Sequence, residues 1–473
     1  MIGFYYPDGK ENFEYDVRGL LTSFFPGEEI RKIPGAMTEE EGRAAGFRVV
    51  YAVPEPDFTR PYEDIKNAFK RRVYDELRGI CGTGLPWGTL TGIRPTKLIM
   101  QMLEEGRRPA EIAERMRRVY YLDGEKLSLA IAIAQRERAV LAGLSGPEGW
   151  SLYAGIPFCP SRCSYCSFTS YPIDKAAGKV EPYLETMFYE MDQSIPLMKG
   201  VQPDTVYIGG GTPTALSAGQ LDRLLDRICR SVDADRVKEF TVEAGRPDSI
   251  TQEKLRVLRN YPVSRISVNP QTMQQRTLDA IGRLHTVEDI VRAFGMVREA
   301  GFDNVNMDLI LGLPGETADD VRDTLAQLRP LAPESLTVHA LAVKRASRLR
   351  REGSGTGEED RFGPSYEKDE PAEMMRAAAA GAQEMGLFPY YLYRQKNMAG
   401  NLENVGYAAP GKEGLYNILI MEEKQSILAL GAGNISKAVY PDGRIERADN
   451  VKGLEEYRLR IEEMIERKRK LWL

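Results

Sequence analysis

Three closely spaced cysteines are the residues of this chain best suited to chemistry. They lie in the run Cys159-Pro-Ser-Arg-Cys163-Ser-Tyr-Cys166. Thiolates are the soft ligands of iron–sulfur clusters, and a complete cubane normally takes four of them. Three thiolates leave one iron open to a small molecule, and the chelating amino-acid end of S-adenosylmethionine fits that vacancy. The run therefore predicts a [4Fe–4S] cluster that binds S-adenosylmethionine.

Two other interpretations of the cysteines compete with the cluster. A zinc site would require a fourth Cys or His nearby, and the two histidines of the chain, His285 and His339, are both distant in the sequence. A disulfide with a spare thiol does not suit an intracellular chain, and an odd total of 5 cysteines favours metal or redox use.

Polar residues follow several predicted strands. The glycine run Gly209-Gly-Gly-Thr-Pro-Thr214 lets backbone N–H groups approach a ligand, while Glu243 and Asp308 end or interrupt apolar strands. Gln271 and Arg283 come shortly after the fourth strand. A satisfied structural carboxylate is the alternative for each acid taken singly, but buried acids are expensive unless they bind something. Chemistry in parallel βα barrels gathers at the carboxyl ends of the strands, so these residues are expected to form one site.

Strands and helices alternate from residue 150 onward, which predicts a parallel sheet with right-handed crossovers. The expected strands cover 151–156, 204–208, 239–243, 265–269, 304–310 and 335–341. The expected helices cover 182–198, 218–231, 249–260, 286–300 and 319–329. Six units favour an open, partial (β/α)6 barrel of the α/β class, and a doubly wound sheet is the alternative.

Four regions are expected along the chain. Residues 1–60 form a small α+β unit, 61–148 a helical region, 149–345 the partial barrel and 346–473 a C-terminal α+β extension. The linker before the barrel is the Gly- and Pro-containing segment 144–149.

Composition excludes several classes of function. The net charge of −5, from 64 basic and 69 acidic residues, gives no nucleic-acid footprint. No apolar stretch is long enough for a membrane span, and the first residues lack the pattern of a secretory signal. We therefore expect a cytoplasmic protein that binds neither nucleic acid nor membrane.

The sequence resembles the radical S-adenosylmethionine superfamily, and within it the oxygen-independent coproporphyrinogen III oxidase (coproporphyrinogen dehydrogenase) family. The resemblance rests on Ile156-Pro-Phe-Cys159, on Gly209–Thr214 and on Asn306-Met-Asp308-Leu-Ile-Leu-Gly-Leu-Pro314. Two further runs, Gly92-Ile-Arg94-Pro-Thr-Lys97 and 397–406, resemble a longer branch with an extra N-terminal region.

The resemblance implies a role for individual residues. The implied cluster ligands are Cys159, Cys163 and Cys166. The implied contacts to S-adenosylmethionine are Tyr153, Tyr165, Gly210, Gly211, Thr212, Glu243, Gln271, Arg283, Asp308 and Ala342. Core packing is the alternative for Tyr153, Tyr165 and Ala342.

The implied reaction is the oxidative decarboxylation of coproporphyrinogen III propionates to vinyl groups, which gives protoporphyrinogen IX in anaerobic porphyrin and haem biosynthesis. The implied partners are a porphyrinogen substrate and an electron donor such as flavodoxin or ferredoxin. Cationic candidates for binding the substrate carboxylates are Lys344, Arg345, Arg348, Arg394 and Lys396, with solvated surface charges as the alternative.

Two positions differ from members of the family that act on porphyrinogens. Those members have a further cysteine where this chain has Phe168, and a histidine where it has Gly155. Two other functions therefore stay open: a haem-binding chaperone of the same superfamily, and a radical enzyme that modifies haem. The chaperone branch has a His-Asn pair where this chain has Tyr416-Asn417.

Overall fold

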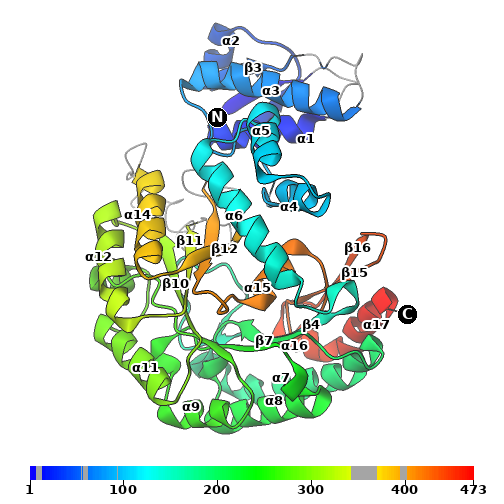
Figure 1. Ribbon diagram of the computed structural model, residues 1–473, viewed down its shortest axis with the longest axis vertical. Coiled ribbons are helices and arrows are strands. Elements are labelled where there is room, and N and C mark those ends of the chain that lie inside the picture. Colours follow the sequence, from blue (N-terminus) through cyan, green and yellow to red (C-terminus); the bar gives the residue numbers. More distant parts are fainter. Residues whose placement is uncertain are drawn as a thin grey trace. The chain divides into compact units, whose positions relative to one another are not determined.

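The computed structural model describes residues 1–6, 13–54, 56, 62–92, 94–341, 370–394 and 402–472. The chain forms two compact units (Figure 1). The first comprises Met1–Arg136 with Leu392–Glu403, and the second comprises Glu137–Tyr391 with Asn404–Leu473. Within the described residues, no helix combines the length and apolar character needed to cross a membrane.

The first unit is built on a small parallel sheet in the order β2-β1-β3. Its strands are β1 (Ile2–Tyr5), β2 (Ile30–Ile33) and β3 (Val49–Ala52), joined by α1 (Glu14–Phe24) and α2 (Glu39–Ala44). The helices α3 (Tyr62–Cys81), α4 (Lys97–Glu104), α5 (Pro109–Tyr120) and α6 (Gly124–Leu141) follow. Apolar side chains of β1, α1 and α3 share one buried core, including Phe4, Leu20 and Phe69.

The second unit is built on a sheet of eleven strands among the described residues. Its order is β12-β13-β11-β10-β9-β8-β7-β4-β14-β15-β16, and the strands from β11 to β14 in this order are parallel. They are β4 (Trp150–Ile156), β7 (Thr205–Gly210), β8 (Glu239–Glu243), β9 (Arg265–Ser267), β10 (Val305–Leu311), β11 (Ser335–Ala340) and β14 (Ser426–Leu430). The sheet is open, because its edge strands do not pair with each other.

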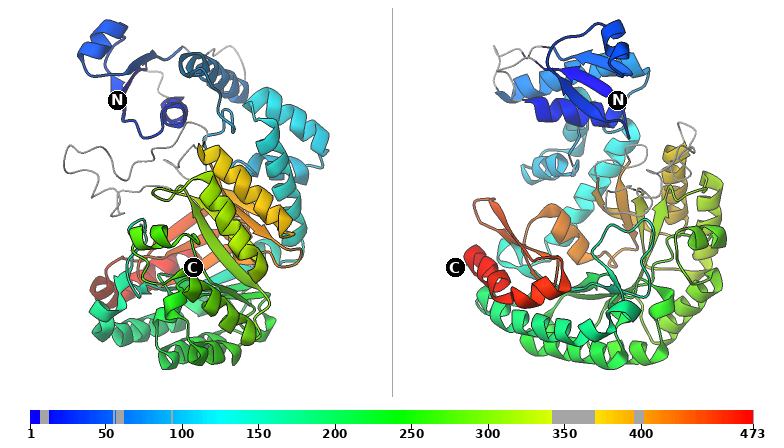
Figure 2. Two further views of the ribbon diagram at one scale, coloured as in Figure 1. Left: turned by 90° about the vertical axis from the view of Figure 1, so that its left-hand side faces the viewer. Right: turned by 180° about the vertical axis from the view of Figure 1, so that it is seen from behind.

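Helices cover the outer side of this sheet. Figures 1 and 2 show α7 (Ile173–Ser194), α8 (Ala218–Ser231), α9 (Gln252–Arg259), α11 (Val287–Glu299) and α12 (Ala318–Leu328) following one another along the convex side. Capping boxes mark the starts of three of them: Ser217 with Gln220, Thr286 with Asp289, and Thr317 with Asp320. The α/β class and the open, partial βα barrel expected from the sequence are confirmed. The boundaries expected at 60, 148 and 345 stay predictions.

The C-terminal extension adds to both edges of the barrel sheet. The strand β13 (Asn404–Ala408) lies antiparallel beside β11, and β12 (Phe388–Tyr393) lies beyond β13 at the edge of the sheet. On the other edge, β14 pairs in parallel with β4, and β15 (Ile435–Val439) and β16 (Ile445–Asp449) continue antiparallel. The helices α14 (Glu370–Glu384), α15 (Leu415–Glu422), α16 (Leu454–Leu459) and α17 (Ile461–Trp472) complete this region. The C-terminal strand β14 is thus a seventh parallel strand, which the six-unit prediction did not include.

A polar network closes the amino ends of the strands. The Glu239 carboxylate, at the start of β8, accepts hydrogen bonds from the backbone N–H groups of Leu415 (2.8 Å) and Tyr416 (3.1 Å). It thereby satisfies donors at the beginning of α15. Arg265, at the start of β9, donates to Ser335 Oγ (2.8 Å) and to the Lys412 carbonyl (2.9 Å). These contacts hold α15 against one end of the barrel and leave the carboxyl ends of the strands for chemistry.

Candidate functional site

The loop that carries the three cysteines begins where β4 ends. Two short strands, β5 (Phe158–Cys159) and β6 (Tyr171–Pro172), pair with each other and close the base of the loop. Farther along, the Ser164 N–H donates to the Ile281 carbonyl at 3.0 Å. The loop is therefore fixed both at its base and near its tip.

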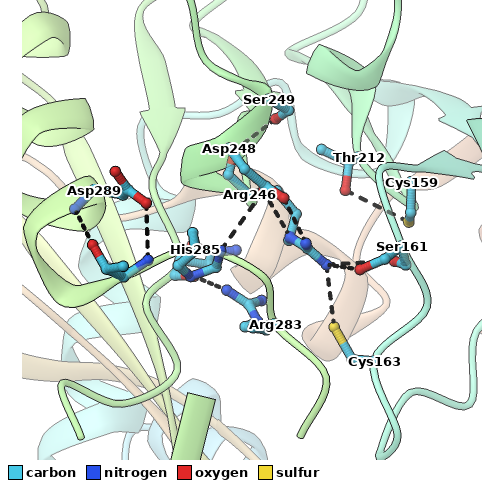
Figure 3. Close-up of polar contacts among 12 residues, drawn as sticks. Cys159, Ser161, Cys163, Thr212, Arg246, Asp248, Ser249, Arg283, His285 and Asp289 are labelled. Carbon is cyan, nitrogen blue, oxygen red and sulfur yellow. Dashed lines mark hydrogen bonds and ion pairs between the residues drawn. The ribbon is translucent and has the colours of Figure 1, made fainter. Parts of the chain in front are cut away.

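Each cysteine sulfur has a hydrogen-bond donor beside it. Thr212 Oγ1 lies 3.5 Å from Cys159 Sγ, and Arg246 Nη1 lies 3.6 Å from Cys163 Sγ (Figure 3). The backbone N–H of Phe168 serves Cys166. Burial raises the pKa of the Cys159 thiol to about 11 and also raises that of Cys166. A cationic metal centre would offset this desolvation, because a coordinated thiol is deprotonated.

The glycine run after β7 packs directly on the cysteine loop. The N–H groups of Gly211 and Thr212 donate to the carbonyls of Ile156 and Phe158, both at 2.8 Å. A Cβ on Gly211 would lie 2.7 Å from the Phe158 carbonyl and 2.9 Å from Cys159 Sγ. Gly210 has a φ of +110°, which disfavours a side chain. These glycines are therefore needed for the close approach to the cysteines, as their position after a strand suggested.

Two carboxylates lie close together on neighbouring parts of the sheet: Glu243 ends β8, and Asp308 lies in the middle of β10. Glu243 Oε1 accepts a hydrogen bond from the Tyr207 hydroxyl at 2.5 Å, and Asp308 Oδ1 accepts one from Asn306 Nδ2 at 2.7 Å. Burial and the Asp308 charge raise the pKa of Glu243 to about 7, although the Tyr207 hydrogen bond opposes this rise. Burial also acts to raise the pKa of Asp308, but contacts with His339, Asn306 and Thr337 outweigh it, so that this pKa is lowered. Both carboxylates are half-buried.

Gln271 and Arg283 lie beyond β9. Gln271 has a left-handed φ of +70°, and its backbone bonds to Asp308 and Ile310 fix it beside β10. The Arg283 guanidinium donates to the Asn269 carbonyl (2.5 Å) and to the Tyr165 hydroxyl (3.3 Å). The structure thus brings Arg283 and Tyr165 together with the cysteine loop.

Three tyrosine rings stack inside the barrel. Tyr207 lies 4.5 Å from Tyr416 and 5.9 Å from Tyr153, measured between ring centroids. Burial and the nearby Glu243 carboxylate raise the pKa of all three phenols. Tyr153 is therefore engaged in aromatic packing, the alternative that its sequence position left open.

Ala342, Lys344, Arg345, Arg348 and Lys396 fall outside the described residues. Arg394 is buried in the first unit, donates to the Leu90 carbonyl at 2.6 Å and lies over the Trp87 ring. The alternative of a solvated surface charge was therefore wrong for Arg394, and its binding of a substrate carboxylate stays a prediction.

The structure shows the surroundings of Gly155 and Phe168, the two positions at which the sequence departs from the family it resembles. A Cβ on Gly155 would lie 2.0 Å from Asn434 Nδ2, so the Asn434 amide fills the space a side chain would need. Phe168 is 68% exposed on the cysteine loop.

Sequence reasoning missed Arg246, Asp248 and Tyr207, and it named Tyr416 only for comparison with the chaperone branch. Arg246 and Asp248 follow directly after β8 and form a bidentate pair, with distances of 2.9 and 2.7 Å. Their position after a strand that ends in an acid was a usable signal. Nothing in the local sequence around Tyr416 indicates that its ring reaches Tyr207.

Comparison with known proteins decides the family. The profile of the radical SAM superfamily matches residues 153–328. The oxygen-independent coproporphyrinogen-III oxidase-like protein HemZ of Bacillus subtilis is 42% identical over 423 residues, which cover 87% of this chain and 82% of HemZ. This chain belongs to the oxygen-independent coproporphyrinogen-III oxidase-like family of radical SAM proteins.

Other relatives share the central part of the chain. The heme chaperone HemW of Bacillus subtilis is 40% identical over 197 residues, 41% of this chain and 51% of HemW. Coproporphyrinogen III oxidase (HemN) of Escherichia coli, a radical SAM enzyme, aligns with a TM-score of 0.54 at 22% identity, over 72% of this chain and 74% of HemN. The HemN likeness shows that the fold is shared.

The family sets the cofactors, which are a [4Fe–4S] cluster and S-adenosylmethionine as expected. The residues present fit both. Ser267 Oγ, Asn269 Oδ1 and Arg283 Nε are buried without a hydrogen-bond partner among the described residues, and buried polar atoms of this kind suit a polar ligand. In the part of the chain that the structure describes, no three Cys, His, Asp or Glu side chains converge as ligands of a single metal ion. A cubane does not require this, because each thiolate binds its own iron.

Binding of S-adenosylmethionine is expected to depend on pH through Glu243. Because the pKa of Glu243 is about 7, its carboxyl group is protonated below neutral pH. It must lose this proton before both oxygens can accept hydrogen bonds from a ribose or an ammonium group. Affinity should therefore rise about tenfold from about pH 6 to about pH 8 and then level off. Equilibrium dialysis of the cluster-loaded protein against S-adenosylmethionine measures this.

The control for this pH dependence is Glu243→Gln, which should bind more weakly and without the rise. An equally steep rise in Glu243→Gln would assign the titration to another group.

Proposed function

We propose that this protein is a radical S-adenosylmethionine enzyme that oxidatively decarboxylates coproporphyrinogen III propionates to vinyl groups, giving protoporphyrinogen IX. One observation carries the proposal: the cysteine loop, the glycine run and the Glu243–Asp308 pair meet at the carboxyl edge of one sheet. Similarity to the oxidase-like protein of Bacillus subtilis supports the choice of substrate class.

Each group of residues has a distinct task in this proposal. Cys159, Cys163 and Cys166 hold the cluster and leave one iron for S-adenosylmethionine. A ligand would approach the cysteine loop beside Gly210, Gly211 and Thr212. Gly211 keeps this space open, because a Cβ there would contact Cys159. Together, the cluster and S-adenosylmethionine supply one-electron chemistry that starts with removal of a hydrogen atom from the substrate.

The remaining residues orient the bound cofactor. Glu243 and Asp308 accept hydrogen bonds from its ribose hydroxyls or ammonium group, and Arg283 faces its carboxylate. Gln271 and Tyr165 complete the same edge. The Tyr153–Tyr207–Tyr416 stack forms an apolar wall that limits water around Glu243.

The electron balance of the proposed reaction defines the partners. Each propionate loses a hydrogen atom, carbon dioxide and one further electron, and an acceptor must take up that electron. A separate electron, from a donor such as flavodoxin or ferredoxin, is consumed for each S-adenosylmethionine cleaved.

An anaerobic assay tests the proposed reaction. Protein with a reconstituted cluster is incubated with dithionite, an electron acceptor, S-adenosylmethionine and coproporphyrinogen III. The expected result is a divinyl product that has lost two carboxyl groups, formed together with 5′-deoxyadenosine. Reactions without S-adenosylmethionine should yield neither product. Formation of deoxyadenosine without any vinyl product would reject this substrate and keep the enzyme class.

Haem carriage is the second candidate, since the heme chaperone HemW shares the central region. The structure offers little for axial ligation by histidine: His285 is 1% exposed, and His339 faces Asp308 at 3.9 Å. Stable Soret absorption after haem addition, with no turnover of the porphyrinogen, would support the carrier. A methylated or ring-opened product from haem would instead support a haem-modifying enzyme.

A further inference from the structure

Arg246 places a buried positive charge against one cysteine of the loop. Its side chain is 4% exposed, and Nη1 lies 3.6 Å from Cys163 Sγ and 3.1 Å from Ser161 Oγ. The other edge of the guanidinium forms two hydrogen bonds with the Asp248 carboxylate. Figure 3 shows Arg246 between Asp248 and the cysteine loop, with one end directed at sulfur and the other held by the acid.

The three sulfurs differ in the charge of the donors beside them. Cys159 lies beside the neutral Thr212 hydroxyl, and Cys166 beside a neutral backbone N–H. The charge of Arg246 also acts on Cys159, and the charges of Arg162 and Arg283 act on Cys166, through space. Cys163 has the Arg246 guanidinium, and the Arg283 guanidinium also interacts with this sulfur. A neutral donor would be enough to fix the orientation of a thiolate, so the burial of a cation at Cys163 calls for a further role.

The carboxylate of Asp248 balances the charge of Arg246 only in part, because it lies on the edge of the guanidinium that is turned away from Cys163. Burial acts to raise the pKa of Asp248, but contacts with His285 and Arg246 outweigh it, so the pKa is lowered and the carboxylate is ionised. His285 Nδ1 lies 3.7 Å from Asp248 Oδ1, and burial lowers the pKa of His285. Asp248 therefore carries the negative charge that opposes Arg246, while the cation is nearer to sulfur.

We propose that Arg246 raises the reduction potential of the cluster through Cys163, and that the negative charge of Asp248 offsets part of this effect. The inference rests on the proposed ligand role of Cys163. Reduction adds one electron, supplied by an external low-potential donor, and takes the cluster from its 2+ to its 1+ state with no bond broken in the protein. Positive charge and N–H donors at the sulfurs stabilise the more negative state, and this effect is strong in a low-dielectric interior.

Variants of the two residues should shift the midpoint potential in opposite directions. Arg246→Met removes both charge and donor and should make the potential more negative. Asp248→Asn keeps hydrogen-bonding atoms but removes the opposing charge, and should make the potential more positive. Arg246→Gln keeps a donor without charge and should fall between Arg246→Met and the unchanged protein. Redox titration of the full-length, cluster-loaded protein, followed by electron paramagnetic resonance, measures all three.

The matched control is Arg230→Met, which removes an exposed arginine paired with Asp226 on α8. Its potential should equal that of the unchanged protein. A role of Arg246 limited to folding predicts reduced iron content with an unshifted potential in the protein that is loaded. That result, or shifts of the same sign in Arg246→Met and Asp248→Asn, would overturn the inference. If Arg246→Met does not fold, Arg246→Gln and Asp248→Asn still decide it.

Iron and sulfide analysis separates this inference from the proposed function. Unchanged protein that binds no cluster after anaerobic reconstitution would overturn both. If the protein is fully loaded but the Arg246 and Asp248 variants have the same midpoint potential as the unchanged protein, only the tuning role is overturned.

Discussion

Cys159→Ala is expected to reduce the iron and sulfide content of anaerobically reconstituted protein to background and to abolish formation of 5′-deoxyadenosine. Cys159 would supply one of three protein thiolates to a cluster that normally has four ligands, so its loss leaves two. Its sulfur also contacts Thr212, which directly follows the three glycines 209–211. Chemical iron and sulfide analysis, together with the visible absorption of the cluster, checks the first effect, and product chromatography checks the second.

The control for this experiment is Cys229→Ala. Cys229 is a half-buried cysteine of α8 outside the loop. Its substitution should leave iron content and turnover unchanged. Iron content in Cys159→Ala equal to that of the unchanged protein, or one zinc and no iron in the latter, would reject the cluster assignment.

Lys468→Met is expected to lower the free energy of unfolding of the second unit by about 3–5 kcal/mol, the usual cost of leaving a buried charge without its counter-ion. Lys468 Nζ lies 2.6 Å from Glu190 Oε1, and neither side chain is exposed. Glu190 also accepts hydrogen bonds from the Tyr457 hydroxyl and the Gly431 N–H. Urea unfolding followed by tryptophan fluorescence and circular dichroism measures the loss.

Two further variants serve as comparisons for Lys468→Met. The double variant Glu190→Gln/Lys468→Met removes both charges and should be less destabilised than the single variant. Arg458→Ala breaks an exposed pair with Glu455, and the change should be within about 0.5 kcal/mol. A loss for Lys468→Met no larger than for Arg458→Ala would show that the buried pair contributes little.

Local patterns were enough to predict the barrel strands. Each expected strand overlaps an observed one, because a buried parallel strand reads as a short apolar run followed by a helix. The start of α7 was placed too late for a physical reason. Pro182 suggested a helix beginning, but it lies inside α7, which starts at Ile173. The helix therefore accepts a proline that lacks one backbone donor.

The parts of the site that the sequence did not reveal depend on tertiary contacts. The seventh parallel strand, β14, comes from a segment far from the barrel in sequence, and only its pairing with β4 assigns it to that sheet. Tyr416 reaches the barrel interior because Glu239 holds the start of α15. By contrast, the types and spacing of the cysteine loop, Gly210, Gly211 and Glu243 predicted that they lie close together, and the structure brings them together.

The pairing of β14 with β4 also orders events during synthesis of the protein. The strand β4 leads into the cysteine loop, yet Ser426–Leu430, its neighbour on one side, emerges from the ribosome more than 260 residues later. Until then the Gly155 carbonyl lacks the Gly431 backbone that packs against it. The edge of β4 that leads into the cysteine loop is therefore completed only when Ser426–Leu430 is available to pair with it.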